Sequence, residues 1–241
     1  MKKFLVVLCA LTMMLSLCAC GSKDELVMAT NAEFPPYEYH EGEAIVGIDV
    51  EIAQAIANEM GRELVIEDMA FDSIIMAVTT GKADMGVAGL TITEDRLESV
   101  SFSIPYTTAA QVIIVKDGSD IASPDDLVGK TVGVQLGTTG DIYAGDIEGA
   151  TIERYNKGYE AVQALLQGKV DAVMIDSQPA NVFVEQNEGI YVVDEAFTYE
   201  EYAIAVAKED TELLEEINAA IKKLEESGEL QAIIDKYIAA E

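Results

Sequence analysis

The chain has few of the residues on which nucleophilic and metal-dependent enzymes rely. All three of its cysteines lie within the first twenty of 241 residues, so no disulfide framework, cysteine nucleophile or cysteine-based metal site is available downstream. Its one histidine, His40, lies in a glutamate-rich loop. This excludes a multi-histidine metal site and leaves a Ser-His-Asp apparatus with a single candidate. The absences favour a binding protein over a hydrolase, and we expect no metal and no cofactor.

Basic residues are also scarce. The chain has 15 lysines and arginines against 44 aspartates and glutamates, for a formal net charge of −29. A polyanion of this kind repels nucleic acid and anionic lipid headgroups, so we expect neither as a partner. Half of the residues are apolar, and the length is sufficient to bury a core. We therefore expect a folded chain rather than a disordered one.

The amino terminus has the pattern of a signal peptide. A short basic segment, MKK, precedes an almost wholly apolar run over residues 4–17, which is too short for a comfortable transmembrane helix. The run ends in LCAC (residues 17–20), which resembles a bacterial lipobox. The resemblance implies removal of residues 1–19, lipidation of Cys20 and a short tether over residues 20–25; an ordinary secretory signal cut nearby is the alternative. We expect an extracytoplasmic protein, periplasmic or lipid-anchored to the outer face of the cell membrane.

Apolar periodicity predicts strands that alternate with helices. Strands are expected at residues 26–30, 64–67, 85–88, 112–115, 130–135, 172–175 and 202–206. Helices are expected at 48–60, 71–80, 94–100, 159–167, 177–186, 212–224 and 229–239, with two more that begin at Ser123 and Asp141. This alternation predicts an α/β fold with mostly parallel sheets.

One stretch of sequence is repeated. AVTTGKAD (77–84) matches ALLQGKVD (164–171), and each contains a helix end, a Gly-Lys turn, an aspartate and then a buried strand. The repeat indicates two similar lobes. In this register Gly89 lies opposite Asp176, and both follow the carboxyl ends of parallel strands, where open α/β sheets bind ligands.

Seven segments together carry a family resemblance. They are ATNAEFPPY (29–37), GIDVEIA (47–53), FDSI (71–74), AGLTITEDR (88–96), SFSIPY (101–106), GTT (137–139) and DAVMID (171–176). In order and spacing they resemble the extracellular solute-binding proteins of polar amino-acid ABC transporters, over about residues 26–237.

The resemblance implies a two-lobed periplasmic-binding-protein fold of type II, each lobe a mostly parallel sheet flanked by helices. Lobe 1 is expected over residues 26–105 and 205–241, lobe 2 over 111–199, and the hinge strands over 106–110 and 200–204. It also implies a monomer that closes on a free polar or basic L-amino acid and delivers it to the permease of an ABC importer.

The residues of the site follow from the matching motifs. The resemblance implies that Arg96 holds the ligand α-carboxylate, because a guanidinium offers it a planar fork. Asp176 is implied to pair with the ammonium, although it also stands where it could cap the helix at residue 177. By the same resemblance, the carbonyl of Gly89 and the hydroxyl of Thr91 are implied to serve the ammonium, and the backbone N–H groups of Thr91 and Thr139 the carboxylate.

The ligand side chain is expected between two aromatic walls, Phe34 and Phe71. Such a slot suits an aliphatic stem, an amide, an imidazole or a guanidinium. Members that select basic amino acids often carry Asp where this chain has Asn31, and Asn suits an amide because it donates as well as accepts. Gln135 and Ile175 lie where specificity varies, and both are neutral.

The choice between glutamine and arginine, lysine or histidine therefore stays open. Glu33 and Asp141 are nearby acids that could serve a cationic side chain. Two other functions are alternatives. A periplasmic dehydratase of the cyclohexadienyl type shares the fold but needs an acid, for which Glu33 is the candidate. A receptor-type sensory domain is usually joined to transmembrane and signalling segments, and none follows here. We expect a binding protein and not an enzyme.

Overall fold

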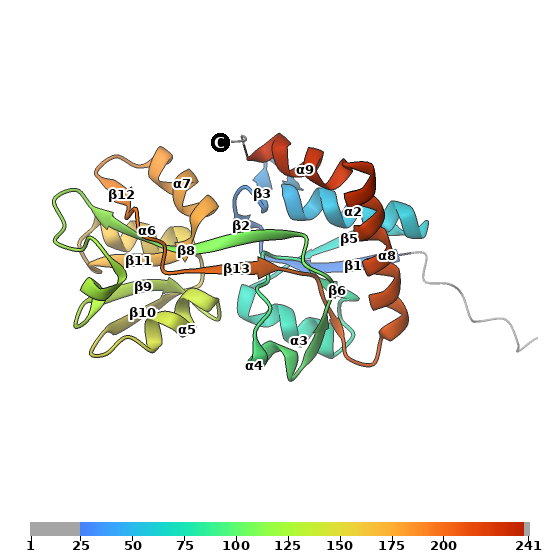
Figure 1. The fold of residues 1–241 in the computed structure, drawn as a ribbon, viewed down its shortest axis with the longest axis horizontal. Coiled ribbons are helices and arrows are strands. Elements are labelled where there is room, and N and C mark those ends of the chain that lie inside the picture. Colours follow the sequence, from blue (N-terminus) through green and yellow to red (C-terminus); the bar gives the residue numbers. More distant parts are fainter. Residues whose placement is uncertain (1–24, 239–241) are drawn as a thin grey trace, which may run out of the picture.

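The structure is a computed structural model that describes residues 25–238. The predicted signal peptide and Cys20 lie outside these residues. Figure 1 shows two α/β lobes side by side, joined by two strands that run between them. None of the helices in the described part of the chain combines the length and the apolar character needed to cross a membrane.

Lobe 1 is a five-stranded sheet flanked by helices. Its strands are β1 (Glu25–Thr30), β5 (Glu63–Asp68), β6 (Met85–Gly86), β7 (Val100–Phe102) and β14 (Ala205–Ala207), and its helices are α2 (Ile48–Met60), α3 (Ile74–Thr79), α4 (Glu94–Leu97), α8 (Thr211–Ser227) and α9 (Glu229–Tyr237). The strand order is β5-β1-β6-β14-β7. β1 is parallel to β5 and β6, while β14 is antiparallel to both of its neighbours, so the sheet is mostly parallel. The apolar faces of α2 and α8 pack together in its core.

Lobe 2 repeats this arrangement. Its strands are β8 (Thr107–Lys116), β9 (Thr131–Gln135), β10 (Thr151–Tyr155), β11 (Ala172–Asp176) and β12 (Ile190–Val192), and its helices are α5 (Thr139–Gly145), α6 (Gly158–Leu166) and α7 (Ser177–Gln186). Five of the six strands of this sheet follow the order β10-β9-β11-β8-β12, which matches that of lobe 1 position by position, and the sixth, β13 (Thr198–Tyr202), pairs with β8. β9 is parallel to β10 and β11, and β8 is the antiparallel strand that arrives from the other lobe.

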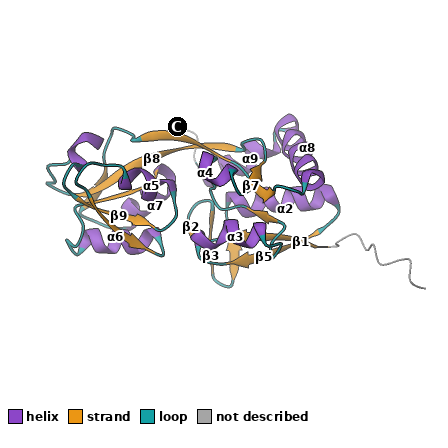
Figure 2. Cartoon of the chain, turned by 90° about the horizontal axis from the view of Figure 1, so that it is seen from below, coloured by secondary structure: helices purple, strands orange, loops and turns teal. Residues whose placement is uncertain are grey.

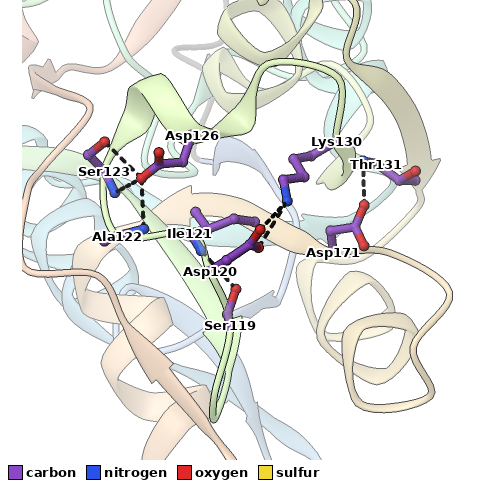
Figure 3. Close-up of polar contacts among 9 residues, drawn as sticks. All are labelled: Ser119, Asp120, Ile121, Ala122, Ser123, Asp126, Lys130, Thr131 and Asp171. Atoms are coloured by element: carbon purple, nitrogen blue, oxygen red, sulfur yellow. Dashed lines mark hydrogen bonds and ion pairs between the residues drawn. The ribbon is translucent and has the colours of Figure 1, made fainter.

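The repeated Gly-Lys-x-Asp segments make equivalent contacts in the two lobes. In lobe 1, Asp84 N donates to Val27 O, and Val27 N donates to Asp84 Oδ2, both at 2.9 Å. In lobe 2, Asp171 and Thr131 exchange the same two bonds, both at 2.8 Å; Figure 3 shows the side-chain bond. Asp84 thus ties the turn before β6 to β1, and Asp171 ties the turn before β11 to β9. The repeat in the sequence therefore reflects a repeat in the fold.

Two neighbouring strands connect the lobes. β8 is ten residues long, and its first half pairs antiparallel with β13 (Thr198–Tyr202). Figures 1 and 2 show β8 and β13 running from one lobe to the other. After β13 the chain enters the lobe 1 sheet as β14, and α8 and α9 then return against α2. The residues of the expected hinge lie in and beside these two strands, and the lobe boundaries stay a prediction.

The expected strand over residues 202–206 is wrong. The chain forms β13 and β14 instead, with a break at Ala203 and Ile204. The break occurs because β13 pairs in lobe 2 and β14 pairs in lobe 1, and a continuous apolar run does not reveal a change of partner. The helix expected from Ser123 is a 3-10 turn (Pro124–Leu127) held by a capping box between Ser123 and Asp126, which Figure 3 shows.

Several strands were not expected. They are β7, β10, β12 and a small sheet of β2 (Glu33–Phe34), β3 (Glu38–Glu41) and β4 (Ala44–Val46). Most are short or exposed on one side, so their sequences lack a strong apolar pattern. The small sheet follows directly after β1 and places Phe34 beside the cleft between the lobes.

Candidate functional site

All nine ligand-binding residues predicted from the sequence line one cavity between the lobes. Lobe 1 supplies six of them: Asn31, Phe34, Phe71, Gly89, Thr91 and Arg96. Lobe 2 supplies Gln135, Thr139 and Asp176, and the lining is completed by Ala88 and Thr138. The fold therefore gathers residues up to 145 positions apart, and their role in binding stays a prediction.

Among these eleven lining residues, the only charged side chains are Arg96 and Asp176. One is a cation from lobe 1 and the other an anion from lobe 2. The remainder of the lining is made of aromatic rings, hydroxyls, amides and backbone. The cavity thus offers one site for a negative group and one for a positive group.

Arg96 is held by the loop and helix that surround it. Thr93 caps α4 by accepting a hydrogen bond from Arg96 N at 3.2 Å. The guanidinium donates from Nη1 to Thr91 O at 2.7 Å and from Nη2 to Gly137 O, in the other lobe, at 3.2 Å. Its Cζ lies 5.5 Å from the centroid of the Phe71 ring, a cation–π distance. Burial lowers the pKa of Arg96, and the charges of Glu200 and Asp176 oppose this.

Asp176 ends β11 and stands at the N-cap position of α7, but its side chain makes no capping hydrogen bond. The helix-cap role is therefore wrong. The carboxylate instead accepts a hydrogen bond from the hydroxyl of Tyr202. Burial, and then the negative charge of Glu200, raises the pKa of Asp176 from 3.8 to about 7, against the opposing effects of Tyr202 and Arg96. A cationic partner would relieve this unfavourable environment.

Gly89 follows β6 and has a left-handed backbone with φ of 54°. Its N–H donates to Asp49 Oδ2 at 2.8 Å, and Asp49 also accepts from the Tyr106 hydroxyl. Glycine is favoured here by this left-handed conformation, and a Cβ at position 89 would also crowd the Phe34 ring, at 3.1 Å. Burial raises the pKa of Asp49 to about 6, and burial with the charge of Asp49 raises that of Glu38 well above its ordinary value. The sequence indicated no role for Asp49 or Glu38 at the site.

The two amides of the site are oriented by the protein. Gln135 donates from Nε2 to Asn31 Oδ1 at 2.9 Å, across the lobes, and to Asn156 O at 3.2 Å. Asn31 in turn donates from Nδ2 to Met69 O at 2.8 Å. Both N–H groups of Gln135 and one of the two N–H groups of Asn31 are thus directed at protein oxygens, and Asn31 Oδ1 already accepts from Gln135. The free lone pairs of the two oxygens are therefore the main groups that the amides offer a ligand, beside one N–H of Asn31.

The three other residues considered for side-chain recognition do not line the cavity. Glu33 pairs with Lys157 of the other lobe, and Asp141 accepts from Arg154 Nε at 2.8 Å. Ile175 is buried in the core of lobe 2. The two acids already have cationic partners. The groups of the cavity lining that remain to contact a ligand side chain are therefore neutral aromatic rings and amides.

Sequence reasoning missed the residues behind the cavity, Glu200, Gln111 and Tyr202, all of which are buried. β13 alternates, with Glu200 and Tyr202 inward and Tyr199 and Glu201 outward. The strand predicted from residue 202 begins at residue 198 in the structure, and a prediction that started there would have shown this alternation. The polar composition of the segment concealed it.

Comparisons with known proteins agree with this geometry. The family described as bacterial extracellular solute-binding proteins, family 3, matches residues 26–240. The chain belongs to this family. The arginine-binding extracellular protein ArtP of Bacillus subtilis (strain 168) is 35% identical over 254 residues, which cover 100% of both chains.

Two solved structures of an ancestral arginine-binding protein superpose well on this family member. One, bound to arginine, is 41% identical with a TM-score of 0.86 and covers 90% of this chain and 99% of its own. The other, bound to glutamine, is 40% identical with a TM-score of 0.85 and covers 91% and 100%. The expected family and the two-lobed type II fold are both confirmed.

Proposed function

We propose that the protein binds L-arginine in the cavity between its lobes and delivers it to the permease of an ABC importer. The observation that carries this is the pair of opposite charges, Arg96 and Asp176, in an otherwise neutral cavity. An amino acid carries one carboxylate and one ammonium on its α-carbon, so its head matches this pair. The amides and aromatic rings are then left for its side chain.

The broader function expected from the sequence is confirmed: amino-acid binding for a transporter, by a protein that acts outside the cytoplasm. The choice of arginine is narrower and rests on the two amides. Three of their four N–H groups are directed at protein oxygens, so the amides offer mainly acceptors and favour a ligand side chain that only donates hydrogen bonds, as a guanidinium does. This reverses the expectation that Asn31 suits an amide. The relatives named for arginine agree, and the relative bound to glutamine makes glutamine the main competitor.

Calorimetric titration with arginine, citrulline, glutamine and lysine tests this choice. Citrulline has the shape of arginine, but a ureido oxygen replaces one nitrogen and would face the oxygens of Asn31 and Gln135. We expect arginine to bind about tenfold or more tightly than citrulline, which corresponds to one lost charge-assisted hydrogen bond. Citrulline or glutamine binding as tightly as arginine would overturn the proposal.

We further propose that binding closes the lobes about the hinge at 106–110 and 200–204. A ligand that contacts both lobes favours the closed state by its differential affinity. Arginine should therefore reduce the radius of gyration measured by small-angle scattering, and the same data should report the mass of a monomer. Identical profiles with and without arginine would contradict closure.

The dehydratase alternative has little support. Its candidate acid, Glu33, pairs with Lys157 and does not line the cavity. An absorbance assay on prephenate and arogenate would detect such activity, and we expect none.

A lipid anchor at Cys20 is the last part of the proposal. Its support is the LCAC motif at the end of the apolar run. Cys20→Ser should release the protein from membranes or block its processing, while the fragment from Ser22 onward should still bind arginine. A mature Cys20→Ser protein that still fractionates with membranes would contradict lipidation there.

A further inference from the structure

Glu200 lies directly behind the cavity, on β13, and is only 6% exposed. One oxygen of its carboxylate, Oε2, accepts three hydrogen bonds. Two come from the hydroxyls of Thr91 and Thr139, each at 3.1 Å, and the third comes from Gln111 Nε2 at 3.0 Å. Thr91 belongs to lobe 1 and Thr139 to lobe 2, so this single oxygen joins the two lobes at the base of the cleft.

The carboxylate decides what the two hydroxyls can offer a ligand. An ionised carboxylate only accepts, so each threonine must donate its one hydroxyl proton to Glu200. Gln111 Nε2 also donates to Thr139 Oγ1, at 3.2 Å. On the cavity side, the hydroxyl of Thr91 is left with lone pairs alone. It can therefore accept from an ammonium, and it cannot donate to a carboxylate.

Glu200 also changes the charge of the site. With Asp176 it places two carboxylates around the single guanidinium of Arg96, which leaves one uncompensated negative charge when both are ionised. Its second oxygen, Oε1, is also buried. Tyr143 lies close by, and burial, then a hydrogen bond to Glu200 and the charge of Glu200, raise the pKa of Tyr143 to about 12. An arriving cation is the natural compensation for this charge.

We propose that Glu200 is a positioning residue for the ligand ammonium, which orients the Thr91 and Thr139 hydroxyls as acceptors and adds a second negative charge behind Asp176. It does not line the cavity and acts through the threonines. This inference deepens the proposed function and rests on it, because it requires a ligand with an α-ammonium group.

The test compares two ligands that differ only in the ammonium. L-arginine and 5-guanidinopentanoic acid share the carboxylate and the guanidinium, and the second lacks the amino group. Calorimetry is run with the wild type and with Glu200→Gln, which keeps the shape and removes the charge. We expect Glu200→Gln to weaken arginine about tenfold or more, as for the loss of a charged hydrogen-bond partner, and to change binding of the analogue about twofold or less.

The neighbouring exposed residue supplies a matched control. Glu201→Gln removes the same charge from the other face of β13 and should leave both affinities unchanged. A Glu200→Gln protein that binds arginine as tightly as the wild type would overturn the inference. Equal losses for both ligands would also overturn it, because they would indicate a general structural role.

A second variant and a second pair of ligands cover two other outcomes. If Glu200→Gln does not fold, Thr91→Val carries the test, since removal of the hydroxyl predicts the same loss for arginine and not for the analogue. If the wild type binds another amino acid in place of arginine, the arginine proposal fails, and the comparison is made with that amino acid and its des-amino form. The two proposals therefore fail on different measurements.

Discussion

Replacing Asp176 by asparagine should make the ligand-free protein more stable and nearly abolish its binding. The carboxyl is buried beside Glu200, and its pKa is raised from 3.8 to about 7. A shift of about three units corresponds to roughly 4 kcal/mol against the ionised form, at about 1.36 kcal/mol per unit. Asparagine has the same shape, carries no charge and can still accept from the Tyr202 hydroxyl.

The pH dependence follows from the direction of this shift. Between about pH 4 and pH 7 the folded protein holds a proton on Asp176 that the unfolded chain has released. Stability therefore falls as the pH rises through this window and stays low above it. Asp176→Asn removes this fall in stability. The free energy of unfolding of the variant should therefore exceed that of the wild type only slightly at pH 4 and by about 4 kcal/mol at pH 8.

Binding should change in the opposite direction. Without the carboxylate, the ligand ammonium loses the only anionic group in the cavity lining, at a cost on the order of 3–5 kcal/mol. At about 1.4 kcal/mol per tenfold change in affinity, arginine should bind about a hundred to several thousand times more weakly than to the wild type.

Urea unfolding of ligand-free protein at pH 4 and pH 8, with calorimetric titration of arginine, measures both effects. Asp194→Asn, at an exposed position in lobe 2, is the matched control and should change neither. An Asp176→Asn protein less stable than the wild type at pH 8 would show that the carboxylate stabilises the fold. Binding within a few-fold of the wild type would show that it is not the ammonium partner.

Three other predictions concern the same cavity and its support. Arg96→Lys should weaken arginine about a hundredfold in calorimetry, because an ammonium cannot reproduce a planar fork. Glu38→Gln should raise the stability measured by urea unfolding at pH 8 and leave it unchanged at pH 4. The raised pKa of Glu38 makes its ionisation unfavourable in the folded state, and an amide carries no charge but can still donate to Asp49. Arginine affinity should fall as the pH drops below about 7, by up to tenfold per pH unit, because the ligand ammonium requires ionised Asp176. Calorimetric titrations from pH 5 to 8 that give the same affinity at every pH would contradict this.

The sequence alone was sufficient for the features that local interactions determine. The bounds of α2 and α7 agree with prediction to the residue, because each helix has a continuous apolar face, and α2 ends at Gly61 in the left-handed conformation. The cavity residues were implied by the resemblance of their motifs to the family, and the fold shows why they meet. Most of them follow the carboxyl end of a strand within a short motif, and a parallel sheet brings such strand ends to one edge.

Only the tertiary structure decided how these residues are supported. Glu200 accepts from Thr91 and Gln111, which lie 109 and 89 residues earlier, and no periodicity in the sequence encodes such contacts. The orientation of Asn31 likewise depends on Met69 and Gln135, and it changed the ligand that the amide favours. Burial and hydrogen-bond partners set the direction of an amide and the pKa of a carboxyl, and both come from chain segments that meet only when the two lobes fold and pack together.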